Sequence, residues 1–80
     1  KLEMDDEAER HLARVMERAP GFGCAFNAMG CFLSRRGRYI EAESNFTTAI
    51  ALEPDNEHYR RNLGLARDRI ESAGAVDTEA

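Results

Sequence analysis

Four residues carry side chains that commonly bind metal ions or act as nucleophiles: Cys24, Cys31, His11 and His58. A structural zinc site needs about four ligands at a recognisable spacing, and these residues show no such spacing. If one helix carries both cysteines, their separation along its axis is about 10.5 Å, which is too far for a disulfide between them. We therefore predict that the chain holds no metal ion and no cofactor, and that both cysteines are free thiols that pack or line a surface.

Carboxylates are the most numerous groups that could act in acid–base catalysis. Many have an arginine three or four residues away, as in Glu7 with Arg10 and Glu17 with Arg14. Pairs at this spacing meet on the surface of a helix and stabilise it by about 0.2–0.5 kcal/mol. The chain also has no glycine-rich phosphate loop, nucleophile elbow or His-Glu-x-x-His motif. We predict that it is not an enzyme.

The charges of both signs are interleaved along the chain, which has a net charge of −4. This pattern argues against a nucleic-acid-binding protein, which usually carries a basic stripe. Two interpretations of the arginines stay open: solvated helix ends, or a docking site for acidic groups of a partner. The arginines concerned form two clusters, one of Arg35, Arg36 and Arg38 and one of Arg60, Arg61, Arg67 and Arg69.

Hydropathy and cysteine content predict the cellular setting. No apolar run approaches the ~20 residues that would span a bilayer, so we expect no membrane segment. Two cysteines are too few to hold a small secreted fold together. We therefore expect a reducing compartment, the cytoplasm.

Apolar residues recur every three or four positions in four segments, which is the pattern of helices with one buried face. The first ends at Pro20-Gly21, the second at Gly37 and the third before Pro54, while Asp55 or Asn56 can cap the fourth. No segment alternates with a period of two. The pattern predicts an all-α domain built from two-helix units, with helices near residues 8–19, 22–33, 39–50 and 59–70.

Shifting the sequence by 34 residues aligns it with itself. Pro20 then falls on Pro54, and Met29-Gly30 falls on Leu63-Gly64. A fixed period of this length indicates a repeat protein. Further pairs are Ala8 with Ala42, Leu12 with Phe46, Val15 with Ala49, Met16 with Ile50 and Phe32 with Ala66.

Residues 23–56 resemble one repeat of the tetratricopeptide-repeat (TPR) family. The matching positions are Phe26, Met29-Gly30, Leu33, Ala42, Phe46, Ala49 and Pro54. The resemblance implies antiparallel helix hairpins stacked as a short solenoid of four helices. Residues 5–19 and 57–73 then resemble half-repeats on either side. Because Arg60 and Arg67 stand where the repeat has large apolar residues, we expect that side of the last helix to face water as a cap.

These boundaries predict the domain organisation. We expect a TPR-like helical domain over residues 5–73. Residues 1–4 are expected to be disordered or vector-derived, and residues 74–80 to form a disordered tail.

The resemblance also implies a concave groove that holds an extended partner peptide. Asn62 matches one asparagine of the carboxylate-binding clamp found in some family members, but Asn27 and Cys31 replace its lysine and first asparagine. We therefore expect no such clamp, and take Arg35 and Arg61 as anion contacts of a looser site. The candidate groove residues are Cys24, Asn27, Cys31, Ser34, Arg35, His58, Arg61, Asn62 and Leu65, with Asp68 and Arg69 further along the last helix.

We expect the chain to be a protein–protein interaction module of a scaffold or co-chaperone-like protein, whose partner is a peptide or protein with acidic groups. The alternative is a structural role. One complete repeat and two half-repeats leave apolar edges, which two copies could cover by pairing their terminal helices as a homodimer.

Overall fold

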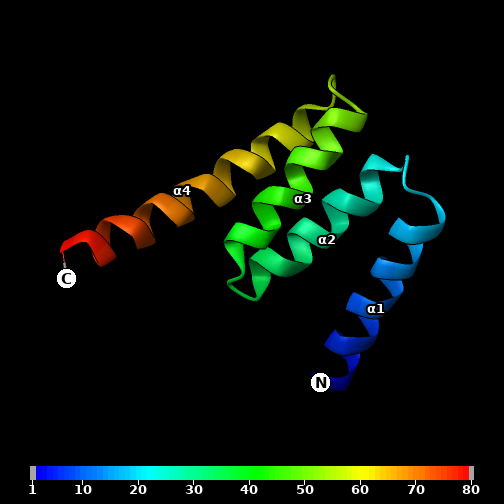
Figure 1. Cartoon of the computed structure of the whole chain (residues 1–80), viewed down its shortest axis with the longest axis horizontal. Helices are drawn as coiled ribbons and strands as arrows, with labels where there is room; N and C mark the ends of the chain where they lie inside the picture. Colours follow the sequence, from blue (N-terminus) through cyan, green and yellow to red (C-terminus); the bar gives the residue numbers. More distant parts are fainter. Residues whose placement is uncertain (1, 80) are drawn as a thin grey trace.

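A computed structural model of the chain describes the backbone of residues 2–79 and the side chains of residues 6–73. Its helices are α1 (Leu2–Arg18), α2 (Gly23–Arg35), α3 (Tyr39–Leu52) and α4 (Glu57–Glu79) (Figure 1). Over the described backbone there is no strand, which confirms the all-α prediction and the expected four helices. The predicted disordered ends, residues 1–4 and 74–80, lie outside the residues whose side chains are described and stay predictions.

Local sequence explains where the helices end. Helix α2 stops at Gly37, the one glycine with a left-handed backbone (φ 79°) among the described residues. There the Arg38 N–H donates to the Leu33 carbonyl at 2.9 Å and the Gly37 N–H to the Ser34 carbonyl at 3.0 Å, the paired bonds of a Schellman motif. Asn56 caps α4, because its Oδ1 accepts a hydrogen bond from the Tyr59 N–H at 3.2 Å.

The four helices lie side by side in the order of the chain (Figure 1). Helices α2 and α3 form an antiparallel hairpin with the most extensive packing in the molecule. Helix α1 packs against α2, while α4 packs against α3 and, over a short stretch, against α2. Helix α4 continues past the start of α3, so its second half overhangs the hairpin.

The core lies where the hairpin meets its neighbours. Phe46 is its centre, with 2% of its surface exposed, and Gly30 of α2 lies directly against the Phe46 ring. A Cβ added at Gly30 would come within 2.7 Å of the ring carbon Cδ1, so only glycine allows this approach. The core residues are Met29, Phe32, Leu33, Ala42, Phe46 and Ala66, joined by the half-buried Leu12, Met16, Cys31 and Leu63.

The outer side of α4 is polar, as expected. Arg60 and Arg67 are exposed, and Arg67 Nε donates to Glu43 Oε2 of α3 at 2.9 Å. The surface over Gly64 is open, with no atom within 4 Å of an added Cβ. The position equivalent to Gly30 therefore has no side chain packed on it within the described residues.

Candidate functional site

The nine candidate groove residues come from two helices. Helix α2 carries five of them and α4 carries four, at spacings of three and four residues that place each set along one side of its helix. We call this surface the α2–α4 strip. It contains Cys24, Asn27, Cys31, Ser34 and Arg35 on α2, and His58, Arg61, Asn62 and Leu65 on α4.

An asparagine pair joins the two helices at the middle of the strip. Asn62 Nδ2 donates to Asn27 Oδ1 at 2.8 Å and approaches Cys31 Sγ at 3.7 Å. All three side chains are half-buried. Burial raises the pKa of the Cys31 thiol, an effect that the nearby Arg35 partly offsets, so at neutral pH the thiol is protonated. The middle of the strip is thus a neutral hydrogen-bonding surface.

Ser34, Arg35 and Leu65 meet at one end of the strip. They line a hollow of about 240 Å³ together with Tyr39, Ala66 and Arg69. Leu65 is 59% exposed, although it is a large apolar side chain. The Arg69 guanidinium carbon lies 5.9 Å from the centroid of the Tyr39 ring, within range of a cation–π interaction. This end therefore has apolar lining residues and two cationic groups, and no acidic residue lines it.

The arginines of the molecule fall into two groups. Arg38 donates to both carboxylate oxygens of Glu41, at 2.6 and 2.9 Å, and to Glu9 at 3.4 Å. By contrast, Arg35 and Arg69 form no ion pair with any carboxylate among the described side chains. Their charges remain available to an anionic ligand, screened only by solvent and salt.

The other end of the strip is less organised. Cys24, His58 and Arg61 are all exposed, and none of them makes a hydrogen bond or ion pair within the described part of the chain. The structure thus brings together the middle residues of the predicted groove and the residues at its Arg35 end. It shows no hydrogen bond or ion pair that would join Cys24, His58 and Arg61.

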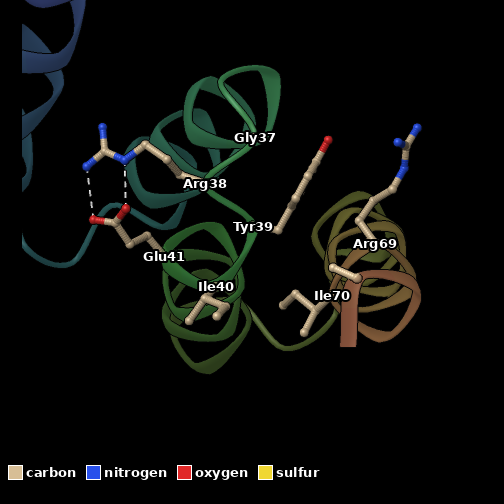
Figure 2. A pocket seen from close by; sticks show the side chains of 8 residues that line it. Gly37, Arg38, Tyr39, Ile40, Glu41, Arg69 and Ile70 are labelled. Carbon is tan, nitrogen blue, oxygen red and sulfur yellow. Dashed lines mark hydrogen bonds and ion pairs between the residues drawn. The ribbon is translucent and has the colours of Figure 1, made fainter. Parts of the chain in front are cut away.

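A second and larger hollow lies where α4 overhangs the start of α3. It measures about 440 Å³, and Figure 2 shows Ile40 and Ile70 on its two sides. The sequence does not predict this hollow, because Tyr39 and Ile70 fit the apolar helical pattern of core residues. The available signal was Ile40, an apolar residue beside Tyr39 that does not fit the buried face of its helix.

Within residues 6–73, no three His, Cys, Asp or Glu side chains come close enough together to hold a metal ion. None of the helices, over the residues described, has both the length and the hydropathy needed to cross a bilayer. Comparisons with protein-family models and with curated proteins give no match for this chain.

Proposed function

We propose that the chain is a TPR-like, non-catalytic module that binds an extended segment of a partner protein along the α2–α4 strip. The observation that carries this proposal is the arrangement of the strip itself. A neutral asparagine pair at its middle leads to a hollow flanked by Arg35 and Arg69, two cations without carboxylate partners among the described residues.

The chemistry of the strip supports a peptide ligand. The Asn27–Asn62 bond uses one Asn62 N–H and one lone pair of Asn27 Oδ1. The asparagine side chains have further donors and acceptors, which match those of an extended peptide backbone. Because the two helices are already held together, little conformational entropy is lost on binding. We place this activity in the cytoplasm, in a scaffold or co-chaperone-like protein.

The test is a titration of the ¹⁵N-labelled chain with short acidic peptides, followed by amide chemical shifts. Saturable shifts at Asn27, Cys31, Arg35 and Asn62 are expected, and Arg35→Ala weakens binding. Arg60→Ala is the matched control, because it removes the same charge from an exposed position outside the strip. If the shifts are absent from both helices, or if Arg60→Ala lowers the peptide affinity as much as Arg35→Ala does, the proposal is wrong.

The second candidate function is self-association, and the surface of α1 favours it. On α1, Leu12 and Val15 remain half-exposed and Ala8 is exposed. Phe22, which follows α1 and immediately precedes α2, is 58% exposed. At the equivalent positions of α3, Ala42, Phe46 and Ala49 are all buried. A second copy could cover the apolar side of α1.

Sedimentation equilibrium under reducing conditions tests this alternative. A dimer that Val15→Glu converts to a monomer would support it. A chain that stays monomeric over a wide range of concentrations would exclude it and leave the peptide-binding proposal.

A further inference from the structure

The two hollows described above share lining residues. Tyr39 and Arg69 line both the hollow at the end of the α2–α4 strip and the larger hollow beyond it. The two side chains also contact each other through the cation–π interaction. A peptide that follows the strip towards Arg35 therefore reaches the Tyr39–Arg69 pair, which also lines the larger hollow.

The larger hollow has apolar sides. Ile40 of α3 and Ile70 of α4 lie on opposite sides of it, below the Tyr39 ring (Figure 2). Ile40 is 72% exposed, the highest value among the large hydrophobic side chains that the structure describes. An aliphatic side chain placed between the two isoleucines would remove apolar surface of all three from water, which is the main source of affinity in such pockets.

The charged side chains at the larger hollow favour an anionic ligand. Glu41 also lines the larger hollow, but its carboxylate is bound by Arg38 on the side of α3 away from Ile70 (Figure 2). Arg69 has no carboxylate partner among the described side chains. Packing of its guanidinium on the Tyr39 ring leaves N–H groups for a ligand, and a planar guanidinium can bind both oxygens of a carboxylate.

We propose that the second hollow binds a large aliphatic side chain of a partner peptide, and that Arg69 binds a carboxylate on the neighbouring residue of that peptide. The occupant is thus an aliphatic–acidic segment. This inference rests on the proposed peptide-binding function and extends it beyond the α2–α4 strip, around the start of α3. It adds Tyr39, Ile40, Arg69 and Ile70 as the residues that decide specificity.

The probes are three short synthetic peptides, blocked at both ends and otherwise composed of Gly and Ser. One contains the pair Leu-Asp, and its controls contain Leu-Asn and Ser-Asp. Binding of the Leu-Asp peptide should change the amide chemical shifts of Ile40, Arg69 and Ile70 in the ¹⁵N-labelled chain. We expect it to bind about 3- to 10-fold more tightly than either control, since each control lacks one of the two contacts. Its affinity should fall as salt is added.

Variants then assign each contact. Arg69→Gln should lower the affinity for the Leu-Asp peptide to that for the Leu-Asn peptide. It should leave the affinity for the Leu-Asn peptide unchanged. Ile40→Ser should lower the affinity for the Leu-Asp peptide to that for the Ser-Asp peptide. Arg60→Gln and Leu52→Ser are the matched controls, because both residues are exposed and lie away from the hollow. Circular dichroism checks that every variant folds.

Three outcomes overturn the inference; the first two leave the proposed function standing, and the third overturns both. If the Leu-Asp peptide shifts Asn27 and Asn62 but not Ile40 and Ile70, the second hollow is not part of the site, while the strip still binds peptide. If Leu-Asp and Leu-Asn bind equally well, Arg69 does not recognise a carboxylate. If no peptide, including longer acidic ones, shifts any residue of either surface, the proposed function fails as well.

Discussion

Helices α2 and α4 carry the same sequence pattern 34 residues apart but have different surroundings. Gly30 lies against the Phe46 ring, whereas the surface over the equivalent Gly64 is open. Leu33 is 3% exposed, whereas the equivalent Arg67 is exposed. Within the described residues, helix α2 has α1, α3 and α4 packed on it, while α4 contacts α3 and, over a short stretch, α2. An equivalent position is therefore buried only where a neighbouring helix covers it.

Substitutions at Leu33 and at the equivalent Arg67 should give the largest difference. Leu33→Arg places a charge in the core with no partner, and we expect a loss of about 3 kcal/mol or more in the free energy of unfolding. Arg67→Leu removes only a surface ion pair with Glu43, so the expected change is within about 1 kcal/mol. Urea unfolding followed by circular dichroism measures both. Similar losses for the two variants would contradict the different burial of α2 and α4.

The two glycines should respond to alanine with opposite signs. Gly30→Ala forces the Phe46 ring to move, and we expect a loss of about 1–3 kcal/mol, even though alanine favours the helix. Gly64→Ala meets no atom within 4 Å, so the higher helix propensity of alanine should raise the free energy of unfolding by about 0.5–1 kcal/mol. Thermal unfolding of the two variants tests the difference, and a destabilised Gly64→Ala variant would show that its surface is covered.

The hydrogen bond between α2 and α4 should have a smaller effect. Asn62→Ala removes the bond to Asn27 Oδ1, and a typical cost is about 0.5–1.5 kcal/mol. Helix α2 already has an alanine, Ala28, at the position equivalent to Asn62. Ala28→Ser is therefore a control that changes the equivalent half-buried position without touching the bond. Equal unfolding curves for Asn62→Ala and the unmodified chain would mean that the bond does not contribute to stability.

Alkylation of the two cysteines tests how far α4 shields α2 from solvent, and it is read out as a reaction rate rather than as a change in stability. Cys24 is exposed, whereas Cys31 is half-buried beside Asn62. Because burial raises the pKa of the Cys31 thiol, less of it is thiolate at neutral pH, and its alkylation should increase only at higher pH than for an ordinary thiol. We expect iodoacetamide to modify Cys24 first, as measured by peptide mass spectrometry. Faster modification of Cys31 would contradict the shielding by α4.

Much of the fold could be predicted because local signals agreed with one another. The apolar period, Pro20, Gly37 and Pro54 together placed the boundaries between successive helices within a few residues of those observed. The outer ends differ, because α1 begins at Leu2 and α4 continues to Glu79, beyond the apolar segments at 8–19 and 59–70. Phe22 shows the limit of the same reasoning. It fits the apolar period of α2, but it precedes the helix and is exposed. Periodicity describes a face of a helix, and it does not show which neighbour reaches that face.

The candidate site was predicted in part for the same reason. Residues on one helix, such as Asn27 and Cys31, share a side because of helical spacing alone. The bond from Asn62 to Asn27 required the packing angle between α2 and α4. The larger hollow required the overhang of α4 beyond α3, which brings Ile70 opposite Ile40. No pattern within either helix specifies that overhang.

From the sequence alone follow the all-α class, the breaks between successive helices and the apolar side of each helix. These properties depend on backbone geometry and on neighbours within a few residues. The tertiary structure decided that Gly30 is covered and Gly64 is not, that Arg69 lies on Tyr39, and that two isoleucines face a hollow. Those contacts join residues of different helices, and they depend on how the helices are placed side by side.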